Sequence, residues 1–267
     1  MKNITLRELK EIQLNVLEAV HNFCLNNNIK YSLACGTLLG AVRHKGYIPW
    51  DDDIDIYMLR EEYNKFITLF PHCYKNHYEL ISLERNSNWN KVYAKAYDNR
   101  TIIYEAMPYK VTIGINIDIF PIDNVPEEEK EWINYNQKRL FFQQCLMAKA
   151  LSFSSHRKFH KNLGIFLAKF LTIFINQRKL AVFLNYYSQK FNQKETKFVF
   201  ENVLGIIMKR RFKKNIFKEF ILMPFENKQF FAFKNYDEYL KNAYGNYMEL
   251  PPINKRISHH LFKAYWK

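Results

Sequence analysis

The feature that most constrains the fold of this chain is a regular alternation of isoleucine with other residues over positions 113–119. Successive side chains of a β-strand point to opposite faces, so the four isoleucines predict a strand with one face in the core. The opposite face of that strand carries Asp118. Because proline cannot donate a hydrogen bond to a sheet, we expect the strand to end at Pro121.

A second strand, predicted over residues 53–59, begins with acidic residues. Asp53 and Asp55 are two positions apart, so both carboxylates would leave the same face of the strand. Neighbouring carboxylates repel each other unless a cation neutralises them, and hard cations such as Mg²⁺ or Mn²⁺ prefer oxygen ligands. With Asp118 as a third carboxylate, the pair indicates metal-assisted phosphoryl transfer. The alternative is that residues 51–53 form a solvated turn.

The other segments of the first half alternate between helix and strand signals. Thr5 and Glu8 form a capping box before a helix that we expect to stop in the asparagine run 26–28. Gly36-Thr37 is expected to break the chain after a short strand. The remaining expectations are helices over 38–44 and 60–70, and strands over 29–34, 78–84 and 91–97. The first half therefore reads as an α/β fold.

The charge of the chain is concentrated in its second half. The net charge is +14, with 14 basic and 15 acidic side chains in residues 1–125, and 26 and 11 in residues 126–267. Hydrophobic residues make up 48%, which excludes a disordered protein. We expect a catalytic core over 1–125 and a basic, mainly helical portion over 126–267, packed as one unit. Its end, 236–267, is expected to return to the active site.

The basic half is expected to attract a polyanion: nucleic acid, an anionic membrane or a phosphorylated substrate. Its most apolar stretch, 163–184, is interrupted by Lys169, Arg178 and Lys179 and is too broken to span a bilayer. That stretch reads either as a buried helix pair or as an interfacial helix with its cations at headgroup level. The first residues lack the apolar run of a signal peptide, which favours a cytoplasmic protein.

Several other residues are candidates for binding. Gly36-Thr37 can present backbone N–H groups and a hydroxyl to a phosphate, and Arg43 lies between this turn and the acidic run. Lys95 and Arg100 either reach a phosphate or are solvated charges at a strand edge. Trp50 either packs or boxes a choline-like cation. His72, Cys73 and His77 form either a partial metal site or ordinary packed and exposed residues.

These motifs together resemble the nucleotidyltransferase superfamily, which has a polymerase-beta-like core. More narrowly, the chain resembles the LicD family of bacterial phosphocholine transferases, to which the fukutin-related ribitol-phosphate transferases are similar. The matching text is GTLLGAVRHKGYIPWDDDIDI at 36–56, KAYDNRT at 95–101, IDIFPID at 117–123 and YGNYMELPP at 244–252, with Arg256. Thr37 departs slightly, since the family often has Ser there, but the hydroxyl is kept.

The resemblance implies a small mixed sheet flanked by helices, and a transferase that uses Mg²⁺ or Mn²⁺. This enzyme would move phosphocholine from a CDP-linked donor to a sugar hydroxyl of a surface glycan (lipopolysaccharide, capsule or teichoic acid) and release CMP. The implied metal ligands and catalytic residues are Asp53, Asp55 and Asp118. The implied donor contacts are Gly36, Thr37 and Arg43, and Lys95 is a further candidate for binding the donor. Tyr247 and Arg256 either close over the nucleotide or belong to a helix cap and the proline turn after it.

Other functions stay open at this point. The donor group could instead be phosphoethanolamine, 2-aminoethylphosphonate or a polyol phosphate. The shared core also suits a nucleotidyltransferase that releases pyrophosphate from a nucleoside triphosphate, and the net charge suits a nucleic-acid-binding protein without chemistry. The carboxylates would repel nucleic acid without a metal, so no nucleic acid is expected. A lipid-linked glycan at the inner face of the cytoplasmic membrane is the expected acceptor, with peripheral contact to anionic lipid.

Overall fold

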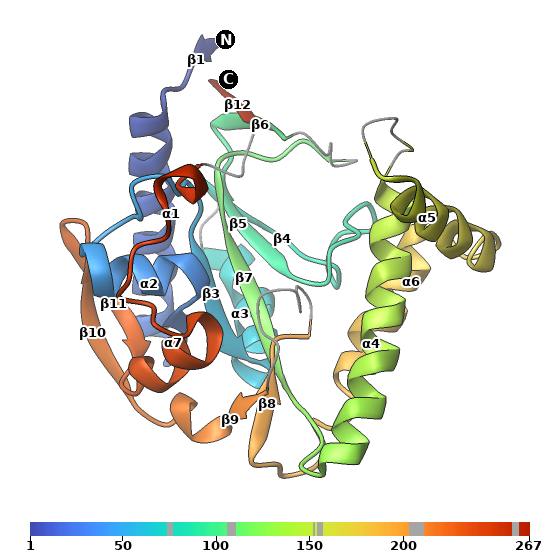
Figure 1. Cartoon of the computed structure of the whole chain (residues 1–267). Helices are drawn as coiled ribbons and strands as arrows, with labels where there is room; N and C mark the ends of the chain where they lie inside the picture. Colours follow the sequence, from blue (N-terminus) through green and yellow to red (C-terminus); the bar gives the residue numbers. More distant parts are fainter. Residues whose placement is uncertain (74–76, 106–110, 152, 154–156, 203–210, 258–261) are drawn as a thin grey trace.

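The computed structural model describes residues 1–267 except 74–76, 106–110, 152, 154–156, 203–210 and 258–261. It is a mixed α/β structure in which helices surround a curled sheet (Figure 1). The helices are α1 (Leu6–Asn26), α2 (Cys35–His44), α3 (Arg60–Cys73), α4 (Glu129–Ala150), α5 (Phe159–Leu171), α6 (Gln177–Ser188) and α7 (Tyr236–Tyr244).

The strands are short, and several join distant parts of the chain. In the first half they are β1 (Lys2–Asn3), β2 (Ser32–Leu33), β3 (Asp55–Leu59), β4 (Tyr78–Ile81), β5 (Ala94–Asp98), β6 (Thr101–Glu105) and β7 (Asn116–Asn124). In the second half they are β8 (Phe198–Phe200), β9 (Phe212–Lys213), β10 (Phe220–Phe225), β11 (Lys228–Phe233) and β12 (Phe262–Trp266).

The largest sheet has the order β2-β3-β7-β5-β4, and β8 and β9 extend it from the end of β7. Strands β3 and β7 are parallel, whereas β5 runs antiparallel to β7 on its other side. Helices α1 and α3 pack on this sheet and on each other, since Phe23 meets the rings of Phe66 and Phe70. The expected α/β character of the first half is therefore confirmed.

The capping box at the start of α1 is confirmed, and the helix ends at Asn26 as expected. Two expectations near the acidic run are wrong. Helix α2 begins at Cys35, so Gly36 and Thr37 form its first turn rather than a break before it. Strand β3 begins at Asp55, where the ladder starts, because Ala34 donates its N–H to the Asp55 carbonyl. Asp53 therefore precedes the strand by two residues, and its charge still acts on Asp55, whose pKa it helps to raise.

Strand β7 does not stop at Pro121 but continues to Asn124. The N–H of Asp118 points to β3, where it donates to the Ile54 carbonyl at 2.8 Å. By alternation, residue 121 faces the opposite side, where β5 pairs only as far as Ile119 and β8 begins only at Asp123. The missing N–H of proline falls in this gap, so it costs the sheet no hydrogen bond.

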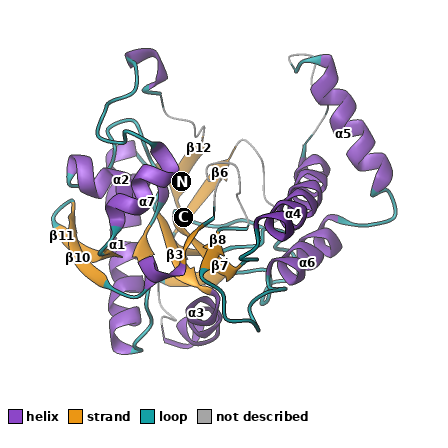
Figure 2. Cartoon of the chain, turned by 60° about the horizontal axis from the view of Figure 1, so that its bottom comes forward, coloured by secondary structure: helices purple, strands orange, loops and turns teal. Residues whose placement is uncertain are grey.

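The second half is mainly helical only as far as Ser188. In Figures 1 and 2, α4, α5 and α6 lie together on one side of the sheet, apart from α1, α2 and α7. After them the chain returns to strands: the β10–β11 hairpin lies beside β2, and β12 pairs with β1 and β6. One continuous core joins side chains from both halves.

The stretch 163–184 forms a helix pair, α5 and α6, separated by residues 172–176, but α5 is not buried: Ile165 is its one buried residue. Arg178, expected as a surface cation, instead donates to the backbone carbonyls of Leu83, Asn86 and Trp89 at 2.8–2.9 Å. Within the described parts of the chain, no helix is long and apolar enough to cross a bilayer. The proposed His72–Cys73–His77 group cannot be traced, since the Cys73 side chain lies outside the described residues.

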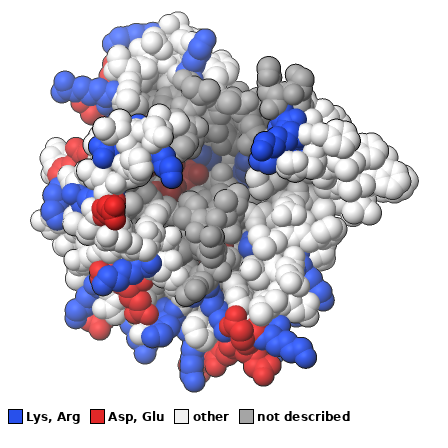
Figure 3. All heavy atoms as spheres, in the orientation of Figure 1, with Lys and Arg blue, Asp and Glu red and all other residues white. Residues whose placement is uncertain are grey.

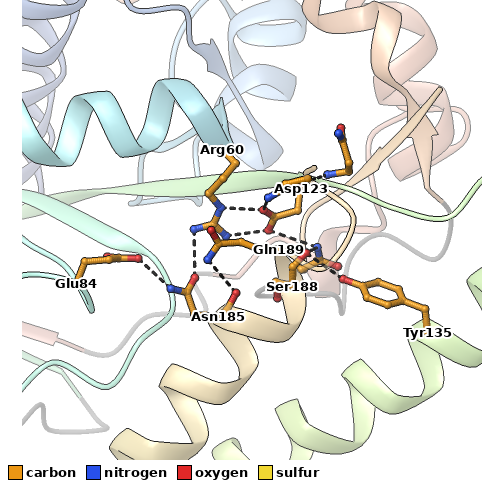
Figure 4. A network of polar contacts seen from close by, with 10 residues as sticks. Arg60, Glu84, Asp123, Tyr135, Asn185, Ser188 and Gln189 are labelled. Carbon is orange, nitrogen blue, oxygen red and sulfur yellow. Dashed lines mark hydrogen bonds and ion pairs between the residues drawn. The ribbon is translucent and has the colours of Figure 1, made fainter. Parts of the chain in front are cut away.

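A buried polar network fastens α6 to the sheet (Figure 4). Arg60, the first residue of α3, makes two hydrogen bonds of 2.8 Å to the carboxylate of Asp123, near the end of β7. Its remaining terminal nitrogen donates to Asn185 of α6 at 3.1 Å. Asn192 and Asn202 also donate to Asp123, so strand, helices and loop meet at one carboxylate.

Candidate functional site

The centre of the site is a pair of carboxylates on adjacent parallel strands. Asp55 begins β3 and stands in register with Asp118 on β7. Asp55 is buried, and burial raises the pKa of its carboxyl well above the usual range, with further contributions from Asp53, Asp118 and Asp51. The sequence predicted that these acids would be neighbours, and the parallel register brings Asp55 and Asp118 together.

Lys95 lies on the other side of Asp118, on β5. Its Nζ is 2.6 Å from the Asp118 carboxylate and donates to the Asn116 side chain at 2.8 Å. The lysine is buried in the sheet, so the alternative of a solvated strand-edge charge is wrong for Lys95. Arg100, by contrast, makes an ion pair with Asp98 and is half exposed. The lysine thus orients Asp118 rather than standing apart from the acids.

The first turn of α2 lies against the acidic run. A Cβ on Gly36 would lie 2.5 Å from an oxygen of the Asp51 carboxylate, so a larger residue there would displace the Asp51 side chain. The Thr37 hydroxyl accepts a hydrogen bond from the Asp55 N–H at 2.9 Å, which ties the helix to the start of β3. The helix N-terminus therefore faces the carboxylates, in the arrangement that stabilises a negative charge or a phosphate.

Arg43 lies in the last turn of α2 and binds the C-terminal segment. It donates to the backbone carbonyl of Tyr247 at 2.8 Å and to that of Glu249 at 3.3 Å. Burial, and then the neighbouring Arg256, lower the pKa of Arg43. The two arginines therefore form a small cationic group beside the acidic run, and Arg43 is committed to the chain segment that follows α7.

Tyr247 and Arg256 occupy different parts of that segment. The Tyr247 hydroxyl donates to Asp237 at 2.8 Å, so its ring packs on α7 and its backbone, not its side chain, meets Arg43. The guanidinium of Arg256 lies 5.6 Å from the ring centre of Trp50. An arginine thus lies over the ring of Trp50, which also packs against the core, while a contact of this ring with a choline-like cation stays a prediction.

A pocket of about 650 Å³ opens on the other side of the acidic run. It is lined by Trp50, Asp51 and Asp52 together with Lys263 and Tyr265 of β12. Figure 3 shows acidic atoms at the edge of a hollow between the two parts of the molecule. The segment 50–52 therefore borders this pocket.

Three residues at the site were not predicted from the sequence. Asn116 holds Lys95, and the Tyr239 hydroxyl accepts the Cys35 N–H at 3.1 Å at the start of α2. Burial, the Cys35 thiol and the carboxylates Asp55, Asp51 and Asp53 raise the pKa of Tyr244 well above its usual range. Only Tyr244 lay in a segment already singled out; α7 had no other signal.

The donor set fits a hard cation in kind. Buried, like-charged carboxylates raise the pKa of Asp55, and a bound divalent cation relieves this repulsion. Among the described residues, however, no three His, Cys, Asp or Glu side chains are gathered closely enough to form a ready metal site. The three-carboxylate site therefore stays a prediction, with Lys95 as the cation that now contacts Asp118.

Comparisons with known proteins show which proteins this chain is similar to. Residues 28–161 match the model of the LicD/FKTN/FKRP nucleotidyltransferase domain family. A lipopolysaccharide cholinephosphotransferase, LicD, of Haemophilus influenzae is 36% identical over 279 aligned positions that cover 99% of each chain. An uncharacterised protein of Rickettsia typhi is 42% identical over 72 residues, which cover 27% of this chain and 23% of that protein. One of Rickettsia prowazekii is 41% identical over 73 residues, 27% of each.

Proposed function

We propose that this chain, which belongs to the LicD family of nucleotidyltransferase-domain proteins, is a transferase that adds phosphocholine to a lipopolysaccharide. The group and the acceptor are those in the name of the full-length Haemophilus relative. The structural observation that carries the proposal is the register of Asp55 with Asp118, which sets two carboxylates side by side at the N-terminus of α2.

The donor in this proposal is a CDP-linked choline. An oxygen of an acceptor sugar hydroxyl bonds to the phosphorus that carries choline. The bond from that phosphorus to the bridging diphosphate oxygen breaks, and CMP leaves with that oxygen. The hydroxyl proton passes to a carboxylate of the site. In-line displacement of this kind depends mainly on positioning and on stabilising the developing charge.

The residues of this chain supply both. Asp118, oriented by Lys95 at 2.6 Å, accepts a hydrogen bond from the attacking hydroxyl. The N–H groups of the first turn of α2 and the Thr37 hydroxyl bind donor phosphate oxygens. Arg43 and Arg256 add positive charge beside the acidic run, and Arg43 keeps the C-terminal segment in place over it.

A divalent cation, Mg²⁺ or Mn²⁺, is part of the proposal. Asp53, Asp55 and Asp118 would hold it, and when bound it would neutralise charge on the diphosphate and on leaving CMP. Lipopolysaccharide precursors are amphiphiles, so the proposed acceptor also implies peripheral contact with a membrane, at its cytoplasmic face.

The test compares the products of the purified protein with a panel of donors. With Mg²⁺ and a truncated lipopolysaccharide acceptor, CDP-choline should give CMP, while nucleoside triphosphates should give no pyrophosphate. Dialysis against EDTA should stop CMP release, and Mg²⁺ or Mn²⁺ should restore it. Asp55→Asn and Asp118→Asn should each abolish turnover, because no other carboxylate replaces either one in register.

Glu11→Gln is the matched control, because Glu11 is an exposed acid of α1 that pairs with the exposed Arg7. Its turnover should equal that of the unmodified protein. Pyrophosphate release from a triphosphate would favour the nucleotidyltransferase alternative. Preference for another CDP-linked or CMP-linked group would keep the reaction and change the donor. Full turnover of Asp55→Asn in excess EDTA would refute the assignment of the site.

A further inference from the structure

Helix α5 and the turn after it carry apolar side chains on the surface of the molecule. Ile165 is the only residue of α5 that is buried. We call the exposed group the α5 apolar face: Phe159, Leu163, Phe166, Leu167, Phe170, Leu171, Ile173 and Phe174. Phe174 is 96% exposed and Phe159 is 81% exposed, so neither side chain is part of the hydrophobic core. A contiguous apolar surface of this kind marks an interaction site.

Hydrogen bonds attach the helix that carries the α5 apolar face to α4. Lys149 of α4 donates from Nζ to the Thr172 carbonyl at 2.6 Å, and the Thr172 hydroxyl donates to the Ala168 carbonyl at 2.6 Å. These bonds fasten the end of α5 to α4, against which the helix packs. In Figure 1, α5 projects from the side of α4 that faces away from the sheet, so its outer surface points outward.

The charge around this face has one sign. Residues 132–194 contain eleven Lys and Arg but no Asp or Glu. Lys161 in the first turn of α5 is exposed, as are Lys158 and Lys179, which flank α5 and the turn after it. Figure 3 shows the same asymmetry: the part of the surface formed by the α4–α6 side carries blue and white atoms, and acidic atoms appear there only at the bottom.

We propose that the α5 apolar face inserts into the surface of an anionic lipid bilayer. Phenylalanine and leucine side chains enter the acyl boundary, while the flanking lysines lie among the headgroups. The inference deepens the proposed function, on whose membrane-borne acceptor its purpose rests, but the contact itself needs no turnover. It also identifies α5, rather than the whole 163–184 stretch, as the inserting element.

A second copy of the chain fits this face poorly. Two such faces brought together would oppose two acid-free, positively charged surroundings, and the repulsion would work against burial of the apolar side chains. A bilayer containing anionic lipid offers the opposite charge and an apolar interior at once. The chemistry of the surface therefore selects the membrane.

The test is flotation of the purified full chain with phosphatidylcholine vesicles, prepared with and without phosphatidylglycerol. At low salt, the protein should float with vesicles that contain phosphatidylglycerol and not with vesicles of phosphatidylcholine alone. It should weaken but persist as salt rises from about 0.01 M to about 1 M, a range over which the screening length falls from ~30 Å to ~3 Å. The double variant Phe166→Ser/Phe170→Ser should lower the partition coefficient at least about tenfold, since it removes two inserting rings.

The matched control is Leu25→Ser/Leu222→Ser, which removes two exposed apolar side chains on α1 and β10. It should float like the unmodified chain, and all variants should keep CMP release with a soluble acceptor. The proposal is overturned if the protein stays in solution at low salt, if both double variants float equally, or if the Phe variant instead dissociates a dimer in sedimentation. Retained flotation without CMP release would overturn only the proposed function.

Discussion

Removal of the Asp123 carboxylate should destabilise the protein more than loss of any exposed charge. Asp123 is fully buried and accepts two hydrogen bonds of 2.8 Å from Arg60, one of 2.7 Å from Asn192 and one of 3.4 Å from Asn202 (Figure 4). In Asp123→Ala, the Arg60 guanidinium, whose side chain is 6% exposed, stays in the interior without its counter-charge. Such a change costs about 3–5 kcal/mol.

The expected change is large enough to measure by thermal unfolding. For a chain of this size, each kcal/mol lowers Tm by about 2–4 °C, so Asp123→Ala should melt roughly 6–20 °C lower. The control is Glu11→Ala, which breaks the exposed Arg7–Glu11 pair of 3.1 Å. Exposed pairs of this kind contribute about 0.3–0.5 kcal/mol, so the control should shift Tm by no more than about 2 °C.

A second variant distinguishes the loss of the Arg60–Asp123 attraction from the cost of leaving the Arg60 charge buried without a counter-charge. Arg60→Met/Asp123→Leu removes both charges and should recover part of the stability lost in Asp123→Ala, because no uncompensated ion remains. If Asp123→Ala melts within about 2 °C of the unmodified protein, the Arg60–Asp123 pair does not stabilise the fold and the reasoning fails. A double variant that melts below Asp123→Ala would show that the other contacts of the two side chains dominate.

Two further predictions concern the site. The pKa of Asp55 is raised in the folded chain, so without metal the free energy of unfolding should fall as pH rises above about 4 towards the folded pKa. The variant Asp55→Asn should lose this pH dependence and melt at a higher temperature than the unmodified protein at pH 7 in EDTA. An unchanged pH profile in this variant would contradict the assigned pKa direction. Tyr239→Phe removes the acceptor of the buried Cys35 N–H and should cost about 1–3 kcal/mol in urea unfolding; stability equal to that of the unmodified protein would show that this bond does not hold the start of α2.

The parts of the fold that the sequence predicted are those encoded locally. Alternating isoleucines identified β7 and the face that carries Asp118, and the capping box identified the start of α1. Both signals lie within a few residues of the structure they describe. The acidic run also indicated the site, because carboxylates are rarely placed in an apolar strand without a reason.

The parts that failed depend on partners far along the chain. Whether Pro121 ends β7 depends on where β5 and β8 stop and start on the neighbouring edge, which no local pattern reveals. The start of β3 depends on the Ala34 N–H, and the role of Lys95 depends on a register that sets it opposite Asp118. In residues 198–267, β8 pairs with β7 and β12 pairs with β1 and β6, so these short strands depend on distant segments. The β10–β11 hairpin, by contrast, is a local structure that the sequence analysis missed.

The same long-range contacts explain why the site needs the whole chain. Residues of the first half supply the carboxylates, but residues of the second half make the contacts that hold α2 and β2 in place beside them. Tyr239 binds the first N–H of α2, the Ser32 hydroxyl accepts from the Phe233 N–H, and Arg43 holds the carbonyls of Tyr247 and Glu249. Each contact spans about 200 residues. A fragment limited to residues 28–161, the part that matches the family domain, would therefore carry all three acids and lack the contacts that orient α2 beside them.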